Sequence, residues 1–125
     1  MKRDMDLIRS ILLDIEESPA GEDWDIETIA KDKEAATVAK HLELMIEAGF
    51  VKGKVDSDIG CTEYWVSGIE LTWEGYEFLD ASRNSEVWKK VKSTVIDSGM
   101  SFSKDVLMSA LKTAALAAIN KLNFG

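Results

Sequence analysis

Apolar residues recur at helical spacing at the start of the chain. They stand three and four positions apart, at Met5, Ile8, Leu12 and Ile15. This spacing places them on one side of a helix, so it predicts a helix over residues 4–17 with that side buried. The Ser-Pro-Ala-Gly run at 18–21 predicts the end of the helix, because proline and glycine interrupt a helical pattern.

The middle of the chain predicts two more helices, over residues 26–31 and 33–48. Asp25 and Asp32 stand where the N-caps of these helices would be. Gly49 follows the second of them, at a position where glycine accepts a left-handed backbone at little cost. The pattern therefore predicts a sharp stop at Gly49.

A hairpin and three further helices are expected after that stop. Residues 50–55 and 62–67 predict two strands, and the Asp-Ser-Asp-Ile-Gly run between them has the residues of a turn. The later helices are expected over residues 73–82 and 86–97, and from 101 or 103 to about 122. The fold class is then mainly α with a small antiparallel β-hairpin. We predict a winged helix-turn-helix core over 1–82 and a C-terminal helical extension over 83–125, packed on the same domain or on a dimer partner.

Two motifs resemble segments of bacterial repressors. "TVAKHLELMIEAGFV", residues 37–51, resembles the recognition-helix segment of ArsR- and PadR-type repressors. "LTWEGYEFL", residues 71–79, resembles the motif that follows the wing in many of them; here Thr72 is expected to cap a helix and Gly75 to permit close packing. The resemblance implies a third helix that enters the major groove and a wing that touches phosphates. It places these residues toward DNA: Lys33, Thr37, Lys40 and His41 on the helix, with Lys52 and Lys54 beside the wing.

The charge of the chain argues against that use. The formal net charge is -8. Residues 1–82 hold 8 Lys/Arg against 20 Asp/Glu, whereas residues 83–125 hold 7 against 3. Phosphate neutralisation supplies most non-specific DNA affinity, and the wing region from Val55 to Glu63 has three carboxylates and no basic residue. We therefore expect a protein-interaction or regulatory module whose partner is a protein, with a DNA-binding transcriptional regulator as the alternative.

Candidate partner-binding residues lie in the acidic segments. Trp24 stands in the polar run "GEDWD", where it either pins the loop to the body or forms an exposed anchor for a partner. Asp56 and Asp58 of the wing are expected to share that role. The other three tryptophans are expected to fill the core.

Nothing in the sequence points to catalysis or to a bound metal. One cysteine, Cys61, and one histidine, His41, cannot build a thiolate and imidazole cluster, and no further group completes a nucleophile with its base. Cys61 is expected to be a small buried apolar residue. We expect no enzyme activity and no cofactor.

The last helix is rich in alanine and has a broad apolar side. We interpret it as a core or homodimer helix, rather than a helix lying on a membrane surface, because it carries few basic and bulky aromatic residues. The residues expected at a dimer contact are Leu107, Leu111, Ala114 and Ala118. No run of apolar residues is long enough to span a membrane, and we expect a cytoplasmic protein.

Nearly the whole chain resembles a family of short proteins from phages, prophages and Gram-positive bacteria, catalogued as domain of unknown function 2513. The resemblance lies in "MKRDMDLIRSILLDIEE" at the start, in "HLELMIEAGFV" and "LTWEGYEFLDASR" in the middle, and in the Trp-Lys-Lys-Val run at 88–91. It implies a winged-helix-like fold and a mobile-element context. It implies no reaction, ligand or partner.

Overall fold

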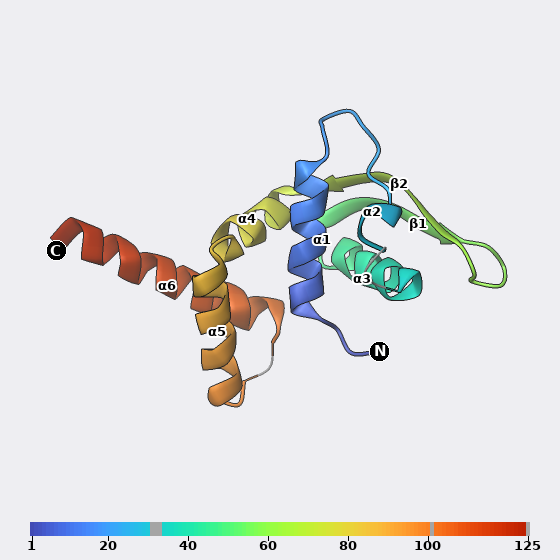
Figure 1. The fold of residues 1–125 in the computed structure, drawn as a ribbon. Helices are drawn as coiled ribbons and strands as arrows, with labels where there is room; N and C mark the ends of the chain where they lie inside the picture. Colours follow the sequence, from blue (N-terminus) through green and yellow to red (C-terminus); the bar gives the residue numbers. More distant parts are fainter. Residues whose placement is uncertain (31–33, 101, 125) are drawn as a thin grey trace. The chain divides into compact units, whose positions relative to one another are not determined.

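The structure is a computed structural model that describes the backbone of residues 1–30, 34–100 and 102–124. The contacts divide the chain into two units, Met1–Glu77 and Phe78–Gly125, which are described separately. The fold is mainly helical with one two-stranded antiparallel hairpin, as expected (Figure 1). The division between core and extension at residue 82 stays a prediction.

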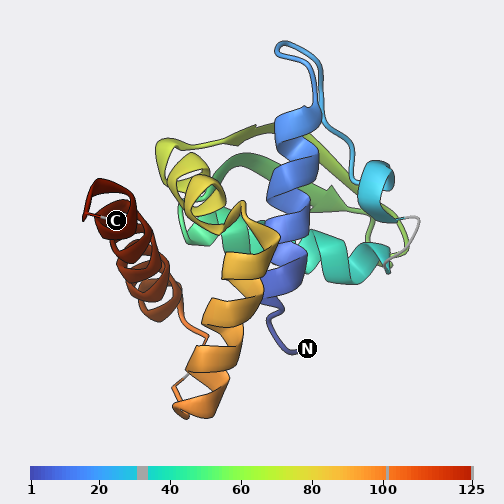
Figure 2. The ribbon, with the colours of Figure 1, turned by 60° about the vertical axis from the view of Figure 1, so that its left-hand side comes forward.

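The first unit contains a helical body and the hairpin. Its elements follow in the order α1 (Met5–Glu17), α2 (Glu27–Ala30), α3 (Ala35–Glu47), β1 (Val51–Ser57) and β2 (Tyr64–Leu71). Helix α4 (Trp73–Ser82) begins in this unit and crosses into the second. Helix α1 packs on α3 and on β2, and the two strands lie side by side (Figures 1 and 2).

Helix α1 forms where the pattern predicts it. The Asp4 side chain caps it by accepting hydrogen bonds from the backbone N–H groups of Asp6 and Leu7, at 2.9 and 3.2 Å. The expected residues Met5, Ile8, Leu12 and Ile15 are buried, and Leu7 and Ile11 beside them are buried as well. This face supplies much of the core of the first unit, together with Val38, Leu42 and Met45 of α3.

The junction of α3, the hairpin and α4 brings both repressor-like motifs together. Gly49 has a φ of +82°, and the Phe50 N–H donates to the carbonyl oxygen of Met45 at 2.9 Å, which closes α3. The Phe50 carbonyl accepts from the Thr72 N–H at 3.0 Å, and the Thr72 hydroxyl donates to the Gly49 carbonyl. Gly75 then passes directly against the Phe50 carbonyl oxygen, so the expected close packing is present.

The hairpin is longer than predicted and contains an irregularity. Its register pairs Val51 with Leu71 and Lys52 with Glu70, and then shifts between Lys52 and Lys54. Gly53, inside the shift, has a φ of +134°, and a β-carbon there would lie 2.7 Å from the Ile69 Cδ1 atom. Such a bulge bends and twists the strand pair.

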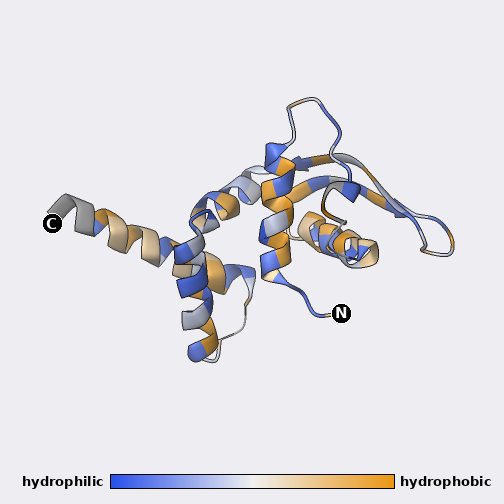
Figure 3. Cartoon of the chain, viewed as in Figure 1, coloured by the Kyte–Doolittle hydropathy of each residue, from blue (hydrophilic) through white to orange (hydrophobic). Residues whose placement is uncertain are grey.

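The second unit contains α5 (Ser85–Asp97) and α6 (Lys104–Phe124), which pack on each other (Figure 2). The Asn84 side chain caps α5 in place of the expected Ser85. Trp88 of α5 meets Phe78 edge to face, with ring centroids 5.9 Å apart. The later part of α6, up to the grey end of the helix, is coloured mostly toward the hydrophobic end of the scale (Figure 3).

Some details differ from the sequence-based prediction. Asp32, the expected cap of α3, lies outside the described residues, and α3 begins after Glu34 without a side-chain cap. The prediction that the remaining tryptophans fill the core is wrong for two of them, because Trp65 and Trp73 are 48% and 78% exposed. Tryptophan number alone therefore does not predict burial.

The junction gives a direct test of the fold. Replacing Gly75 with alanine would drive the new β-carbon into the Phe50 carbonyl oxygen, which is backbone and cannot rotate away. We expect G75A to lower the free energy of unfolding by about 1–3 kcal/mol, although alanine normally favours a helix over glycine. The matched control is E74A, at the exposed neighbouring position of α4. Urea unfolding measures both, and an unchanged or raised stability of G75A would contradict the packing.

Candidate functional site

The exposed side of α3 is the surface that the sequence places toward DNA. Lys33 lies outside the described residues. Thr37 is half-buried, and the ammonium of Lys40 lies 3.2 Å from the Glu43 carboxylate. Glu43 and Glu47 are exposed on the same helix, so the described part of this side carries more negative than positive charge.

His41 does not belong to that surface, and its predicted role toward bases is wrong. Its side chain is 0% exposed. Its Nε2 atom accepts from the Asp4 backbone N–H at 2.9 Å, so Nδ1 carries the proton and donates to the Thr37 carbonyl at 2.8 Å. The physical reason is position: His41 stands three residues after Val38 and four before Met45, on the stripe that faces the core.

The hairpin lysines are also paired with carboxylates. Lys52 lies 3.1 Å from Glu70 across the strands, and Lys54 lies 3.7 Å from Asp56 along β1. These pairs are exposed, so each contributes little to stability. The carboxylates matter more for the electrostatic potential of this surface. From Glu34 to Leu71 the chain has three lysines and seven carboxylates, so the potential there is negative.

Asp58 organises the tip of the hairpin. Its carboxylate accepts from the Thr62 N–H at 2.7 Å, from the Thr62 hydroxyl at 2.6 Å and from the Glu63 N–H at 2.8 Å. The hydrogen bond from the Glu63 backbone, followed by that from the Thr62 hydroxyl, lowers the pKa of Asp58 below its ordinary 3.8. Asp58 therefore has a local structural role in addition to any role toward a partner.

Cys61 lies at the same tip, and its predicted burial is wrong. The residue is exposed and has a φ of +54°, a backbone conformation that suits a turn. Its sulfur lies 3.7 Å from the Ser57 hydroxyl. The tight turn around Asp58 holds Cys61 outward, so a small apolar side chain has no core to enter there.

Trp24 pins the loop between α1 and α2. It is 4% exposed, and its indole N–H donates to the Asp14 carboxylate at 2.6 Å. Of the two roles left open by the sequence, the loop anchor is therefore present, and the exposed partner anchor is wrong. The carboxylate on α1 supplies the acceptor that a buried indole requires.

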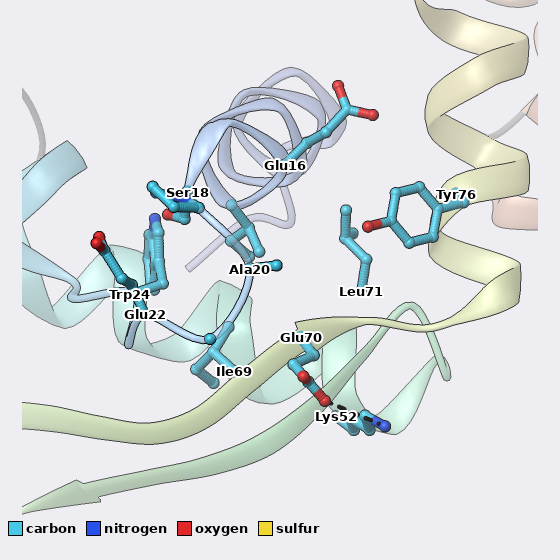
Figure 4. A pocket seen from close by; sticks show the side chains of 13 residues that line it. Glu16, Ser18, Ala20, Glu22, Trp24, Lys52, Ile69, Glu70, Leu71 and Tyr76 are labelled. Atoms are coloured by element: carbon cyan, nitrogen blue, oxygen red, sulfur yellow. Dashed lines mark ion pairs between the residues drawn. The ribbon is translucent and has the colours of Figure 1, made fainter.

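A groove of about 560 Å³ opens beside this loop (Figure 4). One wall is the last turn of α1 with the following loop, and the other is the base of the hairpin with Tyr76 of α4. Apolar side chains lie along its floor: Ile15, Trp24, Ile69 and Leu71. Glu16, Glu22 and the Lys52–Glu70 pair stand around it. Sequence reasoning missed this groove because its walls are far apart along the chain and share no motif.

The predicted dimer residues of α6 do not form one exposed set. Leu107 and Leu111 are fully buried, which contradicts their assignment to a dimer contact. They stand at the start of α6, on the side that packs within the chain. Ala114 is half-buried and Ala118 is exposed.

Within the described residues, no three His, Cys, Asp or Glu side chains come together in a way that could hold a metal ion. The absence of a cofactor stays a prediction. No described helix is both long and apolar enough to cross a membrane.

Comparisons with known proteins give a family and a relative. The model of a family described as "Hypothetical protein (DUF2513)" matches residues 2–101. A protein of Haemophilus influenzae, named only "Uncharacterized protein", is 32% identical over 113 residues, which cover 90% of this chain and 94% of that protein. No solved structure gives a significant match.

The Asp58 network predicts a pH-dependent hairpin tip. Because folding lowers the pKa of Asp58, its stabilising effect is fully present above pH 3.8 and is lost as the pH falls through the lower folded value. We expect the Thr62 and Glu63 amide resonances to shift with a midpoint below pH 3.8, and the D58N variant to lose this transition. A midpoint at or above pH 3.8 in the NMR titration would show that the hydrogen bonds do not favour the charged form.

Proposed function

The chain belongs to the DUF2513 family, and we propose that it acts as a non-enzymatic winged-helix protein of phage or prophage type, a protein-interaction or regulatory module whose partner is a protein. The element order supports the winged-helix part of this proposal, since three helices precede the hairpin and α4 follows it. The phage context rests on the sequence resemblance alone.

One observation carries the choice of protein over DNA. Each described lysine that the repressor resemblance places toward DNA is paired with a carboxylate: Lys40 with Glu43, Lys52 with Glu70 and Lys54 with Asp56. A DNA phosphate would have to displace that carboxylate and would then lie beside it. The release of counterions that drives non-specific DNA binding is correspondingly small.

The surface of α3 and the hairpin also lacks the side chains that most often contact DNA bases. His41, which the resemblance places toward a base, is buried, and its ring nitrogens are hydrogen-bonded to the backbone of Asp4 and Thr37. No arginine occurs between Arg9 and Arg83, so the residue that most often reads guanine is absent from the third helix and the hairpin. A surface of this composition suits a partner that is neutral or positively charged.

The non-enzymatic part of the proposal rests on where the reactive residues lie. Cys61 is at the exposed hairpin tip, while His41 is buried in α3 with both ring nitrogens engaged by backbone groups. A nucleophile needs a base within hydrogen-bonding reach. These two residues do not supply that arrangement.

We further propose a homodimer through the later part of α6. Its surface is the side of α6 that carries Leu116 and Ile119, which stand three residues apart and are 61% and 50% exposed. Ala114 and Ala118 lie on another side of the helix, so the proposed contact no longer includes them. We expect light scattering to give a dimer mass at high micromolar concentration, and L116E to give a monomer. The control is I96E, at an exposed position of α5. A monomeric wild-type chain at that concentration would remove the interface.

The choice between protein and DNA is tested by duplex binding. We expect the wild-type chain to bind a labelled mixed-sequence duplex more weakly than about 10⁻⁴ M at physiological salt, the weak limit of ordinary non-specific binding. The E43K/E47K double variant removes two carboxylates from α3 and frees Lys40, so it should gain salt-sensitive duplex affinity. Fluorescence anisotropy measures both proteins.

The matched control places the same charge change elsewhere. E86K/D97K alters two exposed acidic residues of α5 and should gain less duplex affinity than the α3 variant. Tight, sequence-selective binding of a duplex by the wild-type chain would overturn the proposal in favour of a DNA-binding regulator.

A further inference from the structure

The groove of Figure 4 includes the outer edge of β2, and Lys52 of β1 lies at its border. Three consecutive residues of β2, Ile69, Glu70 and Leu71, line it. Side chains alternate between the two sides of a strand, so three neighbours can share a groove only if it runs along the edge of the strand. In Figure 4 these residues lie below the end of α1, with Ala20 of the following loop above Ile69 and Tyr76 beside Leu71.

The outer edge of β2 is not paired with another strand in the described parts of the chain. The Thr72 N–H donates to Phe50, and Lys52 pairs with Glu70, so the backbone groups of Thr72 and Glu70 point toward β1. Those of Ile69 and Leu71 must point the other way, because the direction alternates along an antiparallel ladder. Within the described parts of the chain, no other backbone segment bonds to them.

The opposite wall is held in place. The Glu22 N–H donates to the Pro19 carbonyl at 3.1 Å, which forms a turn, and Trp24 ties the end of the loop to Asp14. Ile15 and Trp24 lie on the floor between this loop and the strand. The groove is therefore a slot with one polar backbone edge, an apolar floor and a fixed far wall.

The charge around the slot is negative. Glu16, Glu22, Glu70 and Lys52 are the charged residues that line it, so the lining carries more negative than positive charge. The last turn of α1, whose carbonyl end borders the slot, has no basic residue to offset the negative end of the helix dipole. Charge complementarity thus selects a positively charged occupant.

We infer that this slot binds an extended, Lys- or Arg-bearing segment of a partner protein, which adds to β2 as a short strand. About three residues of such a segment span the distance along Ile69–Leu71, at roughly 3.3 Å each. Backbone hydrogen bonds to Ile69 and Leu71 supply affinity, and alternate side chains supply specificity. Basic side chains of the segment meet the acidic rim of the slot, and apolar ones meet the floor. The inference rests on the proposed function and adds the surface and the chemistry of the partner.

The test uses a blocked hexapeptide that alternates lysine and valine. We expect it to bind the full chain, to slow hydrogen exchange of the Ile69 and Leu71 amides and to shift their resonances. A peptide with glutamate in place of lysine should not bind. A Lys-Val peptide that is methylated on alternate backbone nitrogens should not slow the exchange of these amides, because it cannot complete the strand pairing.

Protein variants separate the slot from general attraction to an acidic chain. E16K/E22K should weaken peptide binding about tenfold, because two rim charges are reversed. E43K/E47K makes the same net change on α3 and should bind the peptide as the wild type does. An equal loss in both variants would overturn the slot, since the attraction would then be non-specific.

The remaining outcomes are also decisive. Spermine binding as tightly as the peptide would replace the strand with a small cation and overturn the inference. Self-association of the chain that protects the Ile69 and Leu71 amides without peptide would assign the slot to a second copy. Peptide shifts confined to α3 would overturn the slot but leave the protein-interaction proposal standing. Sequence-selective duplex binding by the wild-type chain would overturn the protein-interaction proposal, whether or not the peptide binds.

Discussion

The Phe50 carbonyl is the point on which the geometry of the first unit depends. It accepts the Thr72 N–H, and Gly75 passes against it without a side chain between them. This contact fixes where β1 begins, where β2 ends and how α4 leaves the hairpin. Because the pairing of Thr72 with Phe50 sets the register of the strands, it also decides which backbone groups of β2 face outward. The slot beside β2 is therefore a consequence of the same junction that closes the fold.

Electrostatics acts on function here more than on stability. The three ion pairs of α3 and the hairpin are exposed, and exposed pairs typically contribute less than about 1 kcal/mol. Their carboxylates nevertheless cancel the positive charge that a polyanion would need. The segments whose sequence resembles that of repressors thus present a surface with more negative than positive charge. The fold alone therefore does not determine the function, since the same scaffold can carry surfaces of different chemistry.

Much of the fold could be predicted from the sequence, because its signals are local. The apolar spacing of α1, the glycine stop at Gly49 and the Thr72 cap each depend on a few neighbouring residues, and each is present in the structure. The element order follows from them. The predicted helix boundaries are less accurate where two neighbouring residues can both serve as the N-cap. At α5 the side chains of Asn84 and Ser85 can each accept hydrogen bonds from backbone N–H groups of the first turn, and Asn84 does so in the structure.

The site residues were harder to predict because their roles depend on distant partners. The repressor resemblance places His41 toward DNA, whereas the structure buries it on the stripe of Val38 and Met45. Its bond to the Asp4 N–H joins residues 37 positions apart, which no local pattern reports. The burial of Trp24 likewise depends on Asp14 of α1. The turn around Asp58 keeps Cys61 exposed, where its small size alone suggested burial.

An open strand edge is normally a hazard, because it invites pairing with other chains. Two features restrict this one. The bulge at Gly53, together with Gly68 at a φ of +64°, interrupts the regular strand, so only Ile69–Leu71 forms a straight edge beside the slot. The acidic rim then repels a second copy of the same acidic unit, while it attracts a basic segment. A short edge with a charged rim can therefore stay free of self-pairing and still accept a partner strand, which is the combination that an interaction module requires.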